Sequence, residues 1–176
     1  GMSGTVLEQA EMYRPEVTGR LQKLLDAGNG AQVEFLDETY YHSLTGFFSD
    51  ARKKEFRDQV SLHREMMKRF FGIKLESFRN TELVYNNTIA EVVSDMGYRT
   101  ILCDRREDMR LDNGCPVPEG VVLKAGESDL LVIIRNGELS AEIECGFSET
   151  GKSAGDCVNR IARSPGNTLL LGFDLE

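Results

Sequence analysis

The chain has 176 residues, of which 40% are hydrophobic and 28% are charged, and its formal net charge is -8. This composition is typical of a water-soluble globular protein, and the length fits one domain, or a large part of one, over residues 1–176. The acidic charge argues against nucleic acid as a partner, because phosphate binding needs a basic surface. Membrane insertion is not expected either, since no apolar run approaches the roughly 20 residues that cross a bilayer.

In chain order, the spacing of apolar residues predicts a helix over 5–26 bent at Pro15, a strand over 32–36, a helix over 50–71 ended by Gly72, a strand over 75–78, a helix over 88–96 and a strand over 98–103. After a charged loop over 104–120, it predicts strands over 121–123 and 129–135, an ambiguous segment over 136–147, a helix over 153–163 and a strand over 168–173. This alternation predicts an α/β protein with a parallel sheet.

The histidines and cysteines do not form a metal-binding pattern. His42 and His63 are the two histidines, and no pair among the four cysteines has C-x-x-C spacing. We therefore expect no metal and no other cofactor, and we interpret the cysteines as reduced thiols of a cytoplasmic protein. His63 lies on the apolar stripe of its helix, where a structural role is expected.

Acidic residues follow three of the predicted strands directly. Glu34, Asp37 and Glu38 lie in or after the first, Glu82 follows the second, and Asp174 and Glu176 follow the last. Ligand-binding and catalytic groups of parallel α/β proteins lie beyond the carboxyl ends of their strands. Cleavage of a glycosidic bond needs two facing carboxylates, although acids at such positions also serve as helix caps or as solvated loop residues.

Three segments carry a family resemblance. They are Gly30–Ser43 (GAQVEFLDETYYHS), Phe78–Asn86 (FRNTELVYN) and Gly172–Glu176 (GFDLE). Together they resemble the amylase-like branch of family 57 glycoside hydrolases, most specifically through Phe-Arg-Asn-Thr-Glu-Leu. The resemblance implies part of a distorted parallel barrel of seven β/α units, incomplete or open, and cleavage or transfer of α-linked glucans with retention and without a metal.

The resemblance also implies roles for individual residues. It places Glu82 as the nucleophile and Asp174 as the general acid. The residues that it places near an oligo- or polysaccharide substrate are Glu34, Tyr40, Tyr41, His42, Arg79 and Asn80. Tyr40 and Tyr41 would offer a stacking face for a sugar, with packing inside the protein as the alternative.

Other family features have no counterpart in this sequence. The first conserved region, a histidine-bearing motif, is absent, and so is the fifth. Two alternatives therefore stay open beside a working enzyme. One is a truncated, non-catalytic relative with at most weak carbohydrate binding. The other is a subunit completed by self-association, because an open barrel exposes strand edges.

Overall fold

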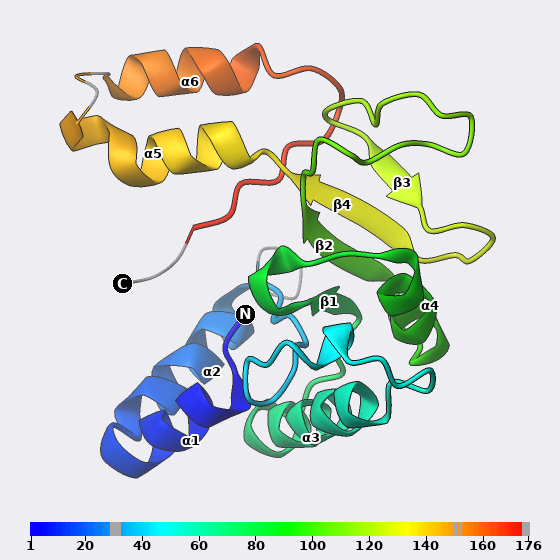
Figure 1. Ribbon diagram of the computed structural model, residues 1–176. Coiled ribbons are helices and arrows are strands. Elements are labelled where there is room, and N and C mark those ends of the chain that lie inside the picture. Colours follow the sequence, from blue (N-terminus) through cyan, green and yellow to red (C-terminus); the bar gives the residue numbers. More distant parts are fainter. Residues whose placement is uncertain (29–32, 150, 152, 174–176) are drawn as a thin grey trace.

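The sheet at the centre of the molecule has four strands. The computed structural model describes residues 1–28, 33–149, 151 and 153–173. Its strands are β1 (Ser77–Arg79), β2 (Thr100–Asp104), β3 (Val122–Lys124) and β4 (Leu131–Arg135), in the order β1-β2-β4-β3 (Figure 1). β1, β2 and β4 are parallel, which confirms the expected sheet for these three strands.

β3 departs from that expectation, because it runs antiparallel to β4. The two strands are joined by a tight turn in which the Ala125 amide donates to the Leu130 carbonyl over 3.0 Å. A connection this short can join only antiparallel neighbours, since a parallel crossover needs a dozen residues or more.

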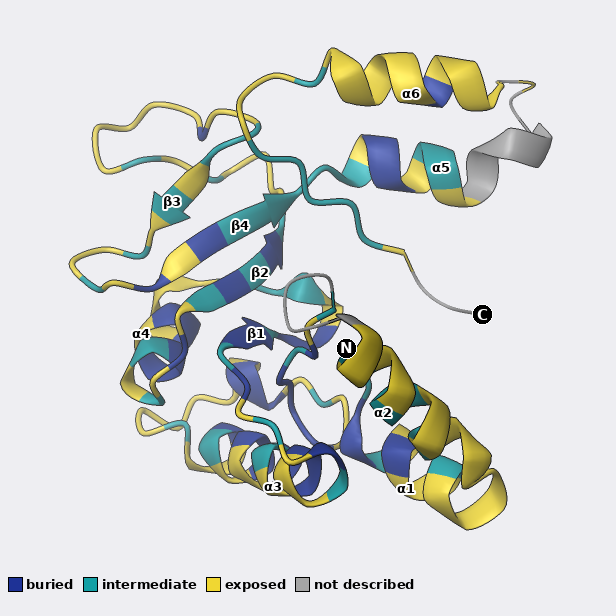
Figure 2. Ribbon diagram, turned by 180° about the vertical axis from the view of Figure 1, so that it is seen from behind, coloured by how far each residue is buried: buried dark blue, intermediate teal, exposed yellow. Residues whose placement is uncertain are grey.

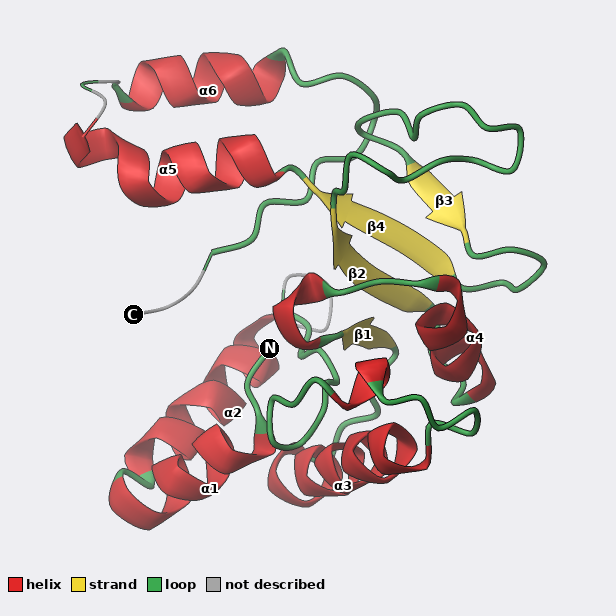
Figure 3. Ribbon diagram, viewed as in Figure 1, coloured by secondary structure: helices red, strands yellow, loops and turns green. Residues whose placement is uncertain are grey.

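The described residues form six α-helices. They are α1 (Gly4–Tyr13), α2 (Glu16–Gly28), α3 (Lys54–Phe71), α4 (Asn87–Asp95), α5 (Gly137–Glu149) and α6 (Ala154–Ala162). Of these, α5 and α6 extend to one side of the sheet (Figure 3). The predicted break at Pro15 separates α1 from α2, and Gly72 ends α3 with a left-handed φ of 65°. The ambiguous segment after β4 is a helix. No helix among the described residues is long and apolar enough to cross a membrane.

Helices α3 and α4 cover one face of the sheet. The strand register aligns Phe78, Ile101 and Val132 on this face, and all three are buried. Phe56 from α3 and Val93 from α4 pack against them in the same cluster, and Figure 2 shows the buried sides of both helices turned inward. Burial of such a side chain contributes about 1.5–3 kcal/mol, so this cluster holds α3 and α4 against β1 and β2.

Two predicted strands shrink to single bridges. Residues 33–36 form no strand, and pairing begins only at Asp37, whose amide donates to the Ser77 carbonyl over 2.9 Å. Near the other end of the chain, one parallel bridge joins Leu170 to Arg135. For the later segment, the reason is that β3 already pairs with residues 131–133 of β4, which leaves only Ile134 and Arg135 at that edge.

Two glycines cross without room for a side chain. The backbones of Gly120 and Gly166 approach so closely that a Cβ on Gly166 would lie 2.1 Å from the Gly120 carbonyl oxygen. That oxygen accepts from the amides of Asn167 (2.9 Å) and Thr168 (3.2 Å), and both glycines have a positive φ. The crossing ties the loop before β3 to the segment after α6.

We expect Gly166→Ala to lower the free energy of unfolding by at least about 2 kcal/mol, because the new methyl group clashes with backbone that cannot move aside. Gly19→Ala, inside α2, is the matched control. No atom lies within 4 Å of its new Cβ, so we expect a gain of about 0.4–1 kcal/mol. Urea unfolding of both variants measures the difference. An unchanged stability of Gly166→Ala would show that the chain does not cross itself here.

Candidate active site

The candidate nucleophile lies in a strained turn after β1. Glu82 is the middle residue of a 3₁₀ turn, Thr81–Leu83, and has the left-handed angles φ 55° and ψ 24°. The amide of Asn80 donates from its side chain to the Val84 carbonyl over 3.0 Å and closes the turn. The Glu82 side chain is 71% exposed, so its carboxylate projects into solvent at the carboxyl end of the strand.

A second loop is held against this turn. The hydroxyls of Thr39 and Thr81 form a buried hydrogen bond of 3.0 Å between the two loops. The Thr39 hydroxyl also accepts from the Ser43 amide over 2.9 Å, which folds residues 39–43 into a compact turn. This docking places His42 beside Glu82.

His42 lies between two carboxylates. Its Nε2 is 3.4 Å from Oε1 of Glu82, and its Nδ1 is 3.4 Å from Oε2 of Glu38. Glu38 is only 1% exposed, and the Arg79 guanidinium lies 3.4 Å from the same Oε2. The side chains of Arg79, Glu38, His42 and Glu82 therefore form a row that passes through the buried Glu38 and ends at the exposed Glu82.

Glu38 is a member of this row that was not among the expected binding residues. The i,i+4 spacing of Glu38 and His42 was the available signal. In an alternating strand, however, the neighbours Glu34 and Glu38 would share one face, and the spacing gave no reason to prefer Glu38. Residues 33–36 form no strand, and Glu38, directly after the single bridge at Asp37, is buried.

A buried network lies directly behind this row. The carboxylate of Asp37 is fully buried and accepts from His63 Nδ1 over 2.5 Å and from the Tyr98 hydroxyl. His63 Nε2 donates to the Met2 carbonyl over 2.8 Å, so both ring nitrogens face acceptors. Arg64 contacts Asp37 over 3.5 Å and lies over the Tyr98 ring. The expected structural role of His63 is thus a charged contact that joins α3 to the loop of the site.

Charge partners decide the titration of His63. Burial disfavours its charged form, but the hydrogen bond and the charge of Asp37 outweigh burial and raise the pKa of His63 above its ordinary value. Burial, followed by the Asp37 charge, raises the pKa of Tyr98, so this hydroxyl remains a donor at ordinary pH. The network is therefore expected to contain one carboxylate and one imidazolium.

The free energy of unfolding should fall as the pH rises because of this pair. The pKa of His63 is raised in the folded protein, so its contribution is complete below the unfolded value of about 6.5 and is lost as the pH rises through the folded value. Urea unfolding at pH 6 and pH 8 should show a larger decrease for the wild type than for His63→Gln. Equal decreases in both proteins would contradict the assignment.

The two tyrosines lie in different environments. Tyr40 is buried against α1, where a Cβ on Gly4 would lie 2.3 Å from its ring. Burial, with a hydrogen bond to Glu8, raises the pKa of Tyr40. Tyr41 is 56% exposed and meets the Tyr40 ring edge-on at 4.9 Å. Tyr41 is therefore the one of the two that is accessible to a sugar, with Tyr40 supporting it from behind.

Two expected site residues are not brought to Glu82 by the described structure. Glu34 is exposed at the opposite edge of the sheet, in a recess of 650 Å³ that is also lined by Glu76, Thr100 and Leu131 at the starts of the strands. Asp174 lies outside the described residues. The structure thus brings His42, Arg79 and Asn80 together with Glu82.

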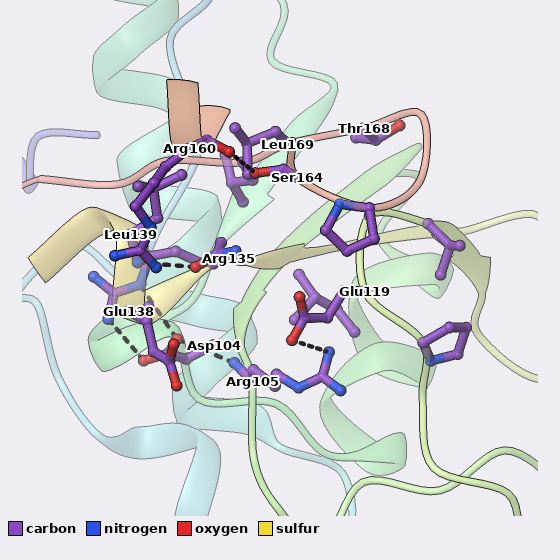
Figure 4. Close-up of a pocket in the computed structure, with 18 of the residues that line it drawn as sticks. Asp104, Arg105, Glu119, Arg135, Glu138, Leu139, Arg160, Ser164, Thr168 and Leu169 are labelled. Atoms are coloured by element: carbon purple, nitrogen blue, oxygen red, sulfur yellow. Dashed lines mark hydrogen bonds and ion pairs between the residues drawn. The ribbon is translucent and has the colours of Figure 1, made fainter. Parts of the chain in front are cut away.

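A second cavity lies at the carboxyl ends of β2 and β4 (Figure 4). Its volume is 570 Å³, and Glu82 is not among its lining residues. Arg135 closes one side through two contacts with Asp104, of 3.2 and 2.8 Å, and Arg105 faces Glu119 at 4.0 Å. The segment 168–170 forms another wall. Sequence reasoning missed this cavity because its walls come from segments up to 66 residues apart.

No group of three or more His, Cys, Asp or Glu side chains in the described part of the chain could hold a metal ion. The cysteines Cys103, Cys115 and Cys157 are free thiols. The candidate site is consequently one of carboxylates, an imidazole and a guanidinium, a set suited to proton transfer and to stabilisation of charge.

Comparison with protein families shows the family of this chain. The family model "Glycosyl hydrolase family 57" matches residues 1–176. A protein of Methanocaldococcus jannaschii named "Putative alpha-amylase" is 32% identical over 180 residues, which cover 99% of this chain and 36% of that protein.

Two solved structures share the fold. The 4-alpha-glucanotransferase of Thermococcus litoralis has a TM-score of 0.64 at 17% identity, over 82% of this chain and 22% of the enzyme. A family 57 branching enzyme from Thermococcus kodakaraensis, solved with glucose, has a TM-score of 0.53 at 17% identity, over 83% and 30%. The chain thus spans about a fifth to a third of the length of these proteins.

Proposed function

Because the chain belongs to glycosyl hydrolase family 57, we propose that it cleaves or transfers α-linked glucans with retention of configuration, using Glu82 as the nucleophile and Asp174 as the acid/base. The observation that carries this proposal is the position of Glu82. Its carboxylate projects from a strained turn at the carboxyl end of β1 and is held by His42. Active sites collect both strained backbone and strand-end carboxylates.

The chemistry requires two steps. In the first, a Glu82 oxygen bonds to the anomeric carbon while the bond to the leaving oxygen breaks, and Asp174 gives that oxygen a proton. In the second, Asp174 takes a proton from water or from a sugar hydroxyl, whose oxygen bonds to the anomeric carbon and releases Glu82. Water as acceptor gives hydrolysis and a sugar hydroxyl gives transfer. Retention expects the two carboxyl groups about 5–5.5 Å apart.

The described segment before Asp174 supports this pairing. The Gly172 carbonyl accepts from Arg135 over 3.4 Å, and the Gly172 amide donates to the Ser140 hydroxyl over 3.2 Å. This segment therefore runs along the edge of the sheet that also carries Glu82. The proposal has two further parts. The sheet is part of the distorted barrel of the family, and Arg79, Asn80 and Tyr41 contact the sugar.

The test is product analysis on soluble starch and maltooligosaccharides. New reducing ends indicate hydrolysis, and redistribution of chain lengths without new reducing ends indicates transfer. Proton NMR of the first product should show an α-anomeric signal that later equilibrates to the mixture. A first product in the β configuration would contradict the retaining mechanism, and the absence of any product would contradict the proposed activity.

A second candidate is a non-catalytic relative that binds carbohydrate weakly. A rise in melting temperature with maltooligosaccharides, without turnover, would support this reading. Self-association that completes the sheet is a separate alternative, and light scattering combined with size-exclusion chromatography measures it directly.

A further inference from the structure

Three residues in a rare backbone conformation meet in the candidate site. His42, Glu82 and Leu83 have φ angles of 52°, 55° and 51°, and they are three of the four non-glycine residues with positive φ in the described ranges. The left-handed region is unfavourable for side chains such as Leu and Glu, and residues held there cluster at functional sites. The fold therefore holds His42 and Glu82 facing each other at a cost in backbone free energy.

The contact between them depends on the ring of His42. Nε2 must carry a proton to donate to Oε1 of Glu82, and Nδ1 faces the buried carboxylate of Glu38. The ring therefore lies between two carboxylates, one exposed and one buried. Glu38 is itself oriented by Arg79 and is almost fully buried. The ring is thus supported from the interior, independently of any substrate.

We propose that His42 is a positioning residue, which holds Oε1 of Glu82 through Nε2 and is itself oriented by Glu38. This inference rests on the proposed function, because it gives Glu82 the role of nucleophile. It replaces the expectation that His42 binds the sugar directly, and it makes Glu38 part of the site.

The arrangement distinguishes the two oxygens of Glu82. Oε1 is engaged by His42, and among the described residues no hydrogen bond or ion pair is made by Oε2. Oε2 is then the oxygen that attacks the anomeric carbon. An exposed glutamate side chain samples several rotamers. The contact of Oε1 with His42 limits these rotamers, so that Oε2 more often has the orientation needed for attack.

The first test does not depend on turnover. The chain has two histidines, so nitrogen NMR of the imidazole rings gives two sets of signals, and His42→Gln identifies those of His42. We expect Glu82→Gln to shift chiefly the Nε2 signal of His42 and Glu38→Gln chiefly the Nδ1 signal. Glu91→Gln, an exposed acid on α4, should shift neither, and unchanged His63 signals in Glu82→Gln report an intact fold. Unshifted His42 signals in Glu82→Gln would overturn the proposal.

The second test separates positioning from substrate binding. His42→Phe should lower kcat by about 10- to 100-fold with KM within about twofold of the wild type. His42→Gln retains a side-chain N–H donor and should recover part of that loss. An increased KM with an unchanged kcat would show that His42 binds the sugar and would overturn the proposal. If the wild type shows no turnover, the proposed function fails, and the NMR test still decides the contact.

Discussion

Glu82→Gln is expected to lower kcat on α-glucans by at least about 1,000-fold. The glutamine amide has nearly the shape of the carboxylate, but it lacks the negatively charged oxygen that bonds to the anomeric carbon. The side chain is 71% exposed, so its replacement should change the free energy of unfolding by no more than about 0.5 kcal/mol. Loss of activity without loss of stability is therefore the result expected if Glu82 has the proposed role.

Glu91→Gln is the control for this experiment. Glu91 is also an exposed glutamate, on α4, and the described structure gives its side chain no hydrogen bond or ion pair. The Glu91→Gln substitution removes one negative charge, as Glu82→Gln does, and the variant should retain wild-type kcat. If Glu82→Gln retained more than about a tenth of wild-type activity, the nucleophile would have to be another residue.

Asp37→Ala is expected to lower the free energy of unfolding by about 3–5 kcal/mol. The substitution leaves the imidazolium of His63 buried without its counter-charge, and loss of one partner of a buried ion pair is costly for that reason. It also removes the acceptor of the Tyr98 hydroxyl and one contact of Arg64. Such a loss is a large share of the stability of a domain of this size.

The matched control is Asp95→Ala. Asp95 forms a 2.9 Å ion pair with Arg57, but both side chains are substantially exposed, so its removal should cost no more than about 1 kcal/mol. Urea unfolding of both variants at pH 6 measures the comparison. Similar losses for the two variants would mean that the Asp37 network is not a stabilising element of the fold.

The sequence was most informative where the signal is local. The helices around Pro15 and before Gly72 follow from backbone restrictions that any fold must respect, and the structure confirms them. The pairing of β3 and of the segment 168–173 could not be predicted, because the two segments compete for the same edge of β4. The antiparallel β3 takes the edge of β4 that the segment 168–173 would need, and no periodicity in either segment reveals that competition.

In the candidate site, too, local features could be predicted from the sequence and tertiary ones could not. The motif around Glu82 and the proximity of His42 could be expected from the resemblance, because both lie in ordered segments next to strands. The burial of Glu38 could not, because it depends on where pairing begins at Asp37 and on the Arg79 guanidinium from the next strand. The direction of a side chain near the end of a strand depends on tertiary contacts, which the local sequence does not show. Glu34 is an example, because it lies at the opposite edge of the sheet from Glu82.

The crossing of Gly120 and Gly166 has a consequence for how the molecule opens. It closes a loop of chain that contains α5 and α6, and these two helices project from the rest of the molecule (Figures 1 and 2). Cys157 is the one buried residue of α6. The helix pair can therefore unfold as a local unit while β4 holds the chain before α5 and the crossing holds the chain after α6. Its amide hydrogens should exchange well before those of β2 and β4, and at a rate insensitive to global stability.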